Sequence, residues 1–247
     1  RKKKVVGHIV KAVSKKPNFY TIQISEILDE EPIFKSNDIG ILFWLADYYQ
    51  HPIGEVFDTF CPPTLRKPVK RNIHSRNIQS EYKAFSNDKK VTLNKEQVES
   101  LEILNNLDGF DPCLLYGVTG SGKTEIYLRL TDTYLTKGKS VLILVPEISL
   151  TPQLEDRFVS RFGDNIGIYH SKKTAKQRYD IWERAQSGEL KIVIGTRSAV
   201  LCPLNELGVI IVDEEHDQSY KQHEGFRFSA RDLSIKRAQV EAIPIVR

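Results

Sequence analysis

Apolar residues in the larger, second part of the chain alternate between short continuous runs and stripes with helical spacing. The runs lie at residues 114–116, 140–145, 166–169, 190–194 and 209–212, and such runs are typical of strands buried on both faces. Between them, apolar positions recur with helical spacing, which predicts helices at residues 95–107, 125–134, 152–162 and 175–186. Strands that alternate with helices predict an α/β fold, a parallel sheet with helices on both faces.

The first part of the chain follows a different pattern. Residues 1–17 hold a short β-like segment at 5–13, and we expect them to end a domain that lies before the chain. Residues 18–61 predict three short helices, of which the second carries an apolar stripe of Ile39, Leu42, Phe43, Ala46 and Tyr49. Such a unit is typical of winged-helix modules, although a purely structural three-helix insert gives the same pattern. Residues 62–90 are rich in proline and polar residues and predict a linker, with room for a strand at 69–78.

A glycine-rich stretch separates the first predicted strand of the second part from the helix that follows. It reads GVTGSGKT and fits the phosphate-binding P-loop pattern G-x-x-x-x-G-K-[ST]. Backbone N–H groups of such a loop, with the positive end of the next helix, hold phosphate oxygens. We expect Lys123 to reach the β- and γ-phosphates of ATP and the Thr124 hydroxyl to bind Mg²⁺. A glycine-rich turn without a ligand is the alternative to an ATP site made of Gly117, Val118, Thr119, Gly120, Ser121, Gly122, Lys123 and Thr124.

Acidic residues follow the last of these apolar runs directly, in the order Asp213-Glu214-Glu215-His216. The carboxyl ends of strands are where α/β sheets bind their ligands. We expect Asp213 to hold Mg²⁺ and Glu214 to orient and deprotonate the attacking water. From its position alone, His216 is expected to couple the nucleotide state to a neighbouring element. The alternative is an acidic turn that caps a helix.

Composition narrows the class of protein. With 247 residues, 40% hydrophobic and 28% charged, the chain has the make-up of a globular protein of one to three domains. No apolar run reaches membrane-spanning length, no signal peptide opens the chain, and three distant cysteines give neither a disulfide framework nor a zinc site, so we expect a cytoplasmic protein. The net charge of +4 is weak evidence for a polyanionic partner. Because the chain lacks methionine and stops within a strand-like run at 245–247, we expect a piece of a longer protein.

Several further stretches suit contact with nucleic acid. Loops after the predicted strands carry hydroxyls, amides and an arginine, which suit a phosphate backbone: Ser149, Thr151, Gln153, Thr196, Arg197 and Ser198. Beyond the acids, aromatic residues alternate with cations, which is typical of a surface on which single-stranded bases stack. A hydrophobic loop packed on the core is the alternative for these residues, which are Tyr220, Lys221, Phe226, Phe228 and Arg231.

These stretches together carry a family resemblance. GVTGSGKTE, VPEISLTPQ, GTRSA and DEEH, in this order, resemble the first four motif blocks of superfamily 2 helicases. Their wording is similar to that of the bacterial primosomal replication-restart helicases, whose aromatic-rich loop resembles DQSYKQ and ARD here. Upstream, LDEEP, ADYY and PIGEV resemble the winged-helix region of that family, and KVVG resembles the end of its 3′-DNA-binding domain.

The resemblance implies an organisation. Residues 91–247 would form a RecA-like P-loop helicase lobe, truncated before the third motif, after a linker at 62–90. Residues 18–61 would be a winged-helix-like DNA-binding domain, and residues 1–17 the C-terminal remnant of an N-terminal DNA-binding domain. The second motor lobe, and a zinc cluster with it, would lie in the missing C-terminal part. We therefore expect this piece to bind nucleotide weakly and not to unwind DNA alone.

The resemblance also implies an activity, a 3′-to-5′ DNA helicase that uses ATP and Mg²⁺ in replication-fork restart and primosome assembly. Gln97 would contact adenine, and Arg197 and the 149–153 loop would meet single-stranded DNA. Expected partners are forked and single-stranded DNA, other primosome proteins and single-stranded DNA-binding protein, with no membrane. Two alternatives stay open: another superfamily 2 DNA translocase, such as a restriction-enzyme motor subunit, and a nucleotide-switched DNA-binding module without unwinding activity.

Overall fold

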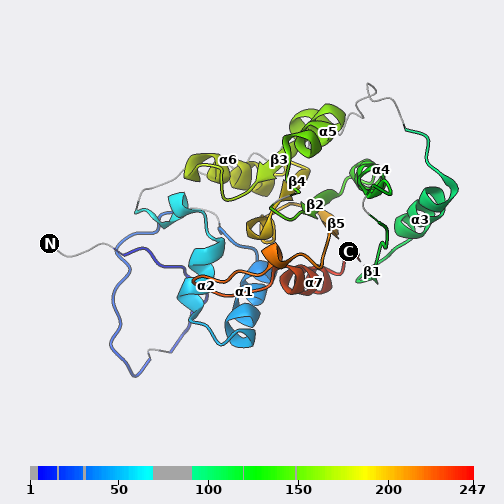
Figure 1. The fold of residues 1–247 in the computed structure, drawn as a ribbon. Helices are drawn as coiled ribbons and strands as arrows, with labels where there is room; N and C mark the ends of the chain where they lie inside the picture. Colours follow the sequence, from blue (N-terminus) through cyan, green and yellow to red (C-terminus); the bar gives the residue numbers. More distant parts are fainter. Residues whose placement is uncertain (1–4, 16, 30–31, 69–90, 119, 148) are drawn as a thin grey trace.

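A parallel β-sheet lies at the centre of the molecule (Figure 1). The structure is a computed structural model that describes residues 5–15, 17–29, 32–68, 91–118, 120–147 and 149–247. Thr119, the first four residues, most of the expected linker and its strand at 69–78 lie outside those residues. The described sheet has the strand order β1-β6-β5-β2-β4-β3. Its strands are β1 (Pro112–Cys113), β2 (Ser140–Leu144), β3 (Ile166–Tyr169), β4 (Ile192–Gly195), β5 (Leu207–Val212) and β6 (Ile245–Val246).

Every strand pair in this sheet is parallel, and helices cover both faces, which confirms the α/β prediction. The strand expected at 114–116 is wrong in position: β1 ends at Cys113. Leu114 and Tyr116 are exposed, because the chain leaves the sheet there to enter the glycine-rich loop. The run at 245–247 does join the sheet, and β6 lies between β1 and β5.

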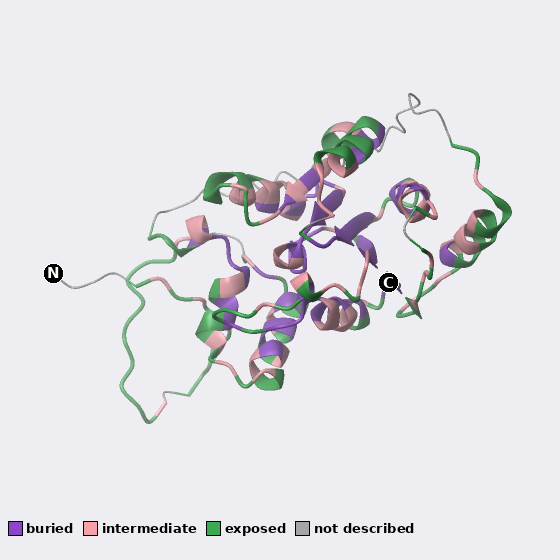
Figure 2. Cartoon of the chain, viewed as in Figure 1, coloured by how far each residue is buried: buried purple, intermediate pink, exposed green. Residues whose placement is uncertain are grey.

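Side-chain alternation along the strands divides the core into two clusters. Val141 and Ile143 of β2 belong to one cluster, whereas Leu142 and Leu144 belong to the other. Figure 2 shows the buried residues concentrated along the central strands and on the helix faces turned toward them. The first cluster packs under α3 (Lys95–Asn105), α4 (Lys123–Thr136) and α5 (Pro152–Phe162). The second packs under α1 (Ser36–Tyr48), α2 (Ile53–Phe60), α6 (Ala175–Gln186) and α7 (Ala230–Glu241).

Local signals in the sequence set several helix boundaries. Thr151 and Thr174 accept hydrogen bonds from the backbone at the starts of α5 and α6, and Ser229 does so at the start of α7. Short 3₁₀ turns complete the connections: η1 (Pro63–Arg66), η2 (Gly163–Asn165), η3 (Arg197–Ala199) and η4 (Gln218–Tyr220). Among the described helices, none combines the length and apolar character needed to cross a bilayer.

The N-terminal region departs from the prediction. Residues 17–29 contain no helix where the first of three was expected, and residues 5–15 contain no strand. Ile22 and Ile24 alternate with polar residues and are 83% and 62% exposed, so they have no apolar surface against which a helix could form. Residues 34–65 instead share one hydrophobic cluster with the sheet. The domain boundaries proposed from the sequence therefore stay predictions.

Candidate functional site

Glycines shape the loop that links β1 to α4. Gly120 and Gly122 adopt φ of +84° and +85°, a left-handed conformation that favours glycine. A Cβ on Gly117 would lie 2.7 Å from Ser121 Oγ, and one on Gly122 would lie 2.4 Å from Gln97 Nε2. The backbone is thus closely packed on itself, and α4 begins at Lys123. The positive end of the α4 dipole therefore lies at the loop, as anion binding requires.

Lys123 reaches across the loop to the acids that follow β5. Its Nζ donates to Glu214 Oε1 at 2.8 Å and to the Gly117 carbonyl at 3.1 Å. Both side chains of the ion pair are mostly shielded from solvent, with 17% exposure for Lys123 and 30% for Glu214. Glu214 itself has φ of +46°, so the turn after β5 adopts a strained backbone that glycine normally takes. The structure therefore brings together two residues 91 positions apart in the sequence.

Asp213 is held by hydrogen bonds to both its backbone and its side chain. Its N–H donates to the Leu144 carbonyl at 2.9 Å, and its Oδ1 accepts from the Tyr127 hydroxyl at 3.0 Å. Burial raises the pKa of Asp213, and the hydroxyl of Tyr127 partly offsets that effect. Burial and the nearby Asp213 charge raise the pKa of Tyr127 well above its ordinary value, so its hydroxyl remains a donor. The sequence did not indicate this role of Tyr127, although Tyr127 lies one helical turn after Lys123.

The oxygen ligands that this site offers suit a metal ion that binds together with a nucleotide. In the described part of the chain, no group of three or more His, Cys, Asp or Glu residues could hold a metal ion by itself. Mg²⁺ at phosphate sites is bound by one or two protein oxygens together with substrate phosphates and water. The Asp213 carboxylate and the half-buried Thr124 hydroxyl match that requirement.

Two predicted residues border this site. Gln97 completes a capping box at the start of α3, and its Nε2 donates to the Ser121 carbonyl at 2.9 Å. It therefore touches the loop that was predicted to hold phosphate. His216 points outward with 80% of its side chain exposed, and its Nε2 lies 3.7 Å from Glu214 Oε2. Its neighbour Glu215 pairs with Arg247 Nη1 at 2.9 Å.

The residues of the loops predicted to contact DNA differ in their exposure and in their hydrogen bonds. Gln153 is exposed at the start of α5, which Thr151 caps, and Ser149 is half-buried. Thr196 is only 3% exposed, and in the described structure neither its hydroxyl nor that of Ser198 has a hydrogen-bond partner. Arg197 donates through Nη1 to the Ser219 and Lys221 carbonyls at 3.1 and 3.4 Å. It thus holds a neighbouring loop, a role that the sequence did not indicate.

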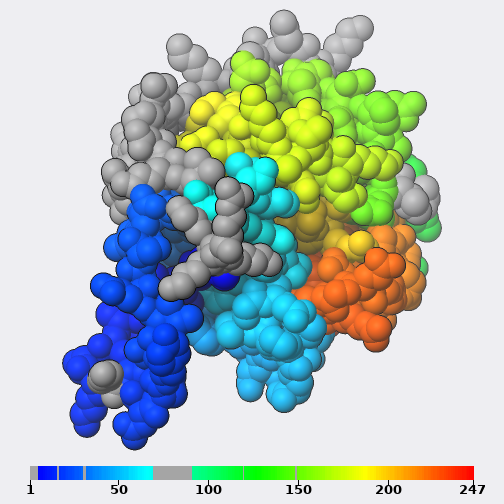
Figure 3. Space-filling view, turned by 90° about the vertical axis from the view of Figure 1, so that its left-hand side faces the viewer, coloured from blue at the N-terminus to red at the C-terminus, as the bar shows by residue number. Residues whose placement is uncertain are grey.

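The aromatic-rich loop, residues 216–231, contradicts the expected exposed stacking surface. Phe226 and Phe228 are 2% and 3% exposed and stack on each other with ring centroids 5.4 Å apart. Their rings meet Tyr49 and Phe60 at 5.7 and 5.1 Å. The rings are buried because α1 and α2 supply an aromatic surface that the local pattern could not reveal. Figure 3 shows this loop, in orange, directly beside the helices drawn in light blue and cyan.

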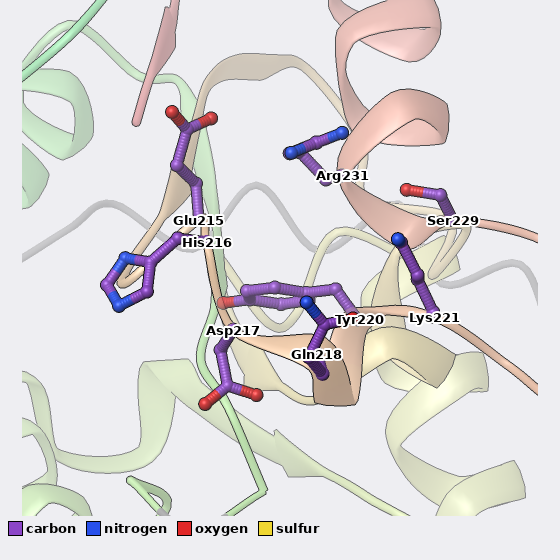
Figure 4. Close-up of a pocket in the computed structure, with 8 residues that line it drawn as sticks. All are labelled: Glu215, His216, Asp217, Gln218, Tyr220, Lys221, Ser229 and Arg231. Atoms are coloured by element: carbon purple, nitrogen blue, oxygen red, sulfur yellow. The ribbon is translucent and has the colours of Figure 1, made fainter.

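Tyr220 completes the link between the aromatic-rich loop and the acids. Its hydroxyl lies 2.6 Å from the Asp213 carbonyl and 3.0 Å from the Leu144 carbonyl, and its side chain is 2% exposed. In Figure 4 the Tyr220 ring lies between His216 and Glu215 on one side and Lys221 and Arg231 on the other. These side chains line a cavity of about 50 Å³, room for water rather than a base. Lys221 is exposed, and the partly exposed Arg231 donates through Nε to Asp232 Oδ1 at 3.2 Å.

Comparison with known proteins finds matches over most of the chain. A family model described as "Type III restriction enzyme, res subunit" matches residues 90–240, and one described as "3'DNA-binding domain (3'BD)" of PriA matches residues 1–62. The "Replication restart protein PriA" of Haemophilus influenzae is 53% identical over 152 residues, which are 62% of this chain and 21% of that protein. Its counterpart in Rickettsia conorii is 36% identical over 250 residues, all of this chain and 37% of that protein. The chain therefore spans well under half of these relatives.

Two solved structures are also similar. RecG bound to a three-way DNA junction matches 63% of this chain, and 21% of the RecG chain, with 21% identity and a TM-score of 0.48. T4 UvsW matches 85% of this chain, and 40% of its own, with 17% identity and the same TM-score of 0.48.

Proposed function

Because the chain belongs to the family described as the res subunit of type III restriction enzymes, we propose that it is the ATP- and DNA-binding part of a replication-restart DNA helicase. The restart assignment draws on the name shared by the Haemophilus and Rickettsia relatives and on the 3′-DNA-binding-domain match at residues 1–62. In this proposal the longer protein moves 3′ to 5′ along DNA in the cytoplasm. Its substrates are forked and single-stranded DNA, and its partners are primosome proteins and single-stranded DNA-binding protein.

One observation carries the proposal: the Lys123–Glu214 ion pair joins the glycine-rich loop to the acids after β5. An ammonium at the start of a helix and a carboxylate at a neighbouring strand end are the two groups that phosphoryl transfer to water requires. On binding, the γ-phosphate would compete with Glu214 for Lys123. Glu214, once released, can accept a proton from a water aligned with that phosphate.

The remaining residues have supporting tasks in this mechanism. Mg²⁺, when bound with the nucleotide, neutralises charge that develops on the β- and γ-phosphates. Thr124 and Asp213 are the residues that would hold it. Gln97 would contact adenine, since it already borders the loop through the Ser121 carbonyl. His216 lies close to Glu214 and is exposed to solvent, so it would couple the nucleotide state to a neighbouring element.

DNA would cross the same sheet edge. Lys221 and Arg231 line the same cavity, Arg227 is a further exposed cation of the aromatic-rich loop, and these side chains can pair with backbone phosphates. Gln153 and the amides at the start of α5 can add contacts from the other side. Arg197 and the buried aromatic rings would hold the loop in place rather than touch bases.

The test is Lys123→Ala in the full-length protein, with Lys139→Ala as a matched control. Lys139 lies at the opposite edge of the sheet, where its Nζ pairs with Glu206 at 2.8 Å on the surface. We expect Lys123→Ala to lose ATP hydrolysis and unwinding while fork binding persists, and Lys139→Ala to retain all three. Unchanged ATP hydrolysis by Lys123→Ala would contradict the motor assignment. A Lys123→Ala protein that no longer hydrolyses ATP but still unwinds DNA would contradict it as well.

A further inference from the structure

Helix α4 carries a buried tyrosine whose hydroxyl faces the acids after β5. Tyr127 is 4% exposed and lies one turn beyond Lys123, on the side of α4 turned toward the sheet. Its hydroxyl donates to Asp213 Oδ1 at 3.0 Å, across 86 positions of sequence. A hydroxyl that donates to a buried carboxylate does more than fill space in the core, because it determines which carboxylate oxygen remains available to bind another group.

We propose that Tyr127 is a positioning residue that orients the Asp213 carboxylate toward Mg²⁺. The inference rests on the proposed function, in which Asp213 and Thr124 hold that ion. A carboxylate rotates readily about its terminal torsion unless a hydrogen bond restrains it. With Oδ1 engaged by Tyr127, Oδ2 and one lone pair of Oδ1 remain for the metal.

Placement on α4 gives this hydrogen bond a second consequence. Lys123, Thr124 and Tyr127 all belong to the first turns of one helix, so they move as one body. Asp213 belongs to a different part of the chain and directly follows β5, which ends at Val212. The Tyr127–Asp213 hydrogen bond therefore sets the separation between the two oxygens that would share the metal.

The main chain of Asp213 is restrained independently. The Tyr220 hydroxyl lies 2.6 Å from the Asp213 carbonyl, and the Asp213 N–H donates to Leu144. These contacts fix the backbone and leave the side-chain torsion as the remaining freedom. Tyr127 removes that freedom, which separates its role from the role of Tyr220.

The test compares nucleotide binding with and without metal in the full-length protein. Partners that hold a ligating carboxylate typically change metal affinity by about 10–100-fold when removed. We expect Tyr127→Phe to weaken ADP binding about tenfold in Mg²⁺ and to leave it unchanged in EDTA. Tyr134→Phe removes a hydroxyl from another buried tyrosine of α4, away from the acids, and should change neither affinity.

Asp213→Asn separates this inference from the proposed function. If Asp213→Asn abolishes the Mg²⁺ dependence of ADP binding and Tyr127→Phe leaves it intact, Tyr127 is a structural residue only. The same conclusion follows if Tyr127→Phe weakens binding equally in Mg²⁺ and EDTA. If the wild-type protein shows no Mg²⁺ dependence, the proposed site and this inference both fail. If the two substitutions together weaken binding no more than Asp213→Asn alone, Tyr127 acts through Asp213 as proposed.

Discussion

Two regions lie at the carboxyl ends of the strands, and different kinds of interaction stabilise them. On one side, the glycine-rich loop meets the acids through charged and polar groups, above all the Lys123–Glu214 pair. On the other, the aromatic-rich loop is fastened to α1 and α2 by buried rings, with Phe226 and Phe228 at its centre. The polar region can change partners when a phosphate arrives, whereas the aromatic region can open only by exposing apolar surface.

Tyr220 is the point where the two regions touch. It belongs to the aromatic-rich loop by sequence, yet its hydroxyl lies against the Asp213 carbonyl. The contrast teaches that ligand chemistry and mechanical support are separable in this molecule. Substitutions in the polar region should change catalysis with little effect on stability, and substitutions in the aromatic region should do the reverse.

The sharpest expected effect is on catalysis, through Glu214→Gln. Loss of a positioned general base lowers rates by about 10²–10⁴-fold, so we expect ATP hydrolysis by the full-length protein to fall by that range. Its melting temperature should stay close to that of the wild type, as thermal unfolding would show. Glu215→Gln, next in sequence but paired with Arg247, is the matched control and should hydrolyse ATP normally. The comparison breaks if Glu214→Gln retains wild-type hydrolysis.

The aromatic region should respond to Phe228→Ala in the opposite way. Truncating a buried phenylalanine costs about 3–5 kcal/mol of unfolding free energy, because a cavity replaces the ring. Phe19→Ala, at a site 72% exposed, should cost almost nothing. Chemical denaturation of both variants measures the difference. Equal stabilities would mean that the loop is not fastened to α1 and α2 as the structure shows.

A smaller effect isolates one hydrogen bond between the aromatic-rich loop and the end of α1. The buried Ser229 N–H donates to the Tyr49 hydroxyl at 3.0 Å, across 180 positions of sequence. Tyr49→Phe leaves that N–H without its partner and should cost about 1–3 kcal/mol. Tyr48→Phe, where the side chain is exposed, serves as the control. If denaturation finds the two variants equally stable, the bond contributes nothing.

The smallest effect should appear at the exposed cations. Lys221→Ala should change stability by less than about 0.5 kcal/mol, since the side chain is exposed. If Lys221 pairs with one phosphate, the slope of log affinity for single-stranded DNA against log salt should fall by about 0.7. Lys137→Ala, at the opposite edge of the sheet, should leave the slope unchanged. A salt titration in which the two variants agree would exclude Lys221 from the DNA path.

Elements with local signals were predicted from the sequence, and elements that depend on distant partners were not. Helices α5 and α6 have the predicted ranges 152–162 and 175–186, and strand β3 matches the predicted run at 166–169. The glycine-rich loop was predictable because its function needs consecutive residues. The burial of Phe226 and Phe228 was only an alternative at that point, since it depends on Tyr49 and Phe60, which lie more than 160 residues earlier in the chain.

The supports of the acids were missed for the same reason. Tyr127 was not singled out by the sequence, and Tyr220 was predicted to stack on DNA bases, whereas the fold sets both hydroxyls against Asp213. The first N-terminal helix was predicted wrongly because the apolar residues around Ile22 and Ile24 suggested a packed unit, while the structure leaves them exposed. Sequence patterns identify which residues have chemistry to offer, but pairing across the sheet decides which of them meet.

The central claim is that the polar region exchanges an internal ion pair for a phosphate. A crystal structure of the protein with Mg²⁺ and a non-hydrolysable ATP analogue tests it directly. The account predicts the γ-phosphate on Lys123 at the start of α4, with Glu214 released from that lysine and turned toward a water. A structure with the analogue bound elsewhere, or with Lys123 still paired to Glu214 at full occupancy, would contradict it.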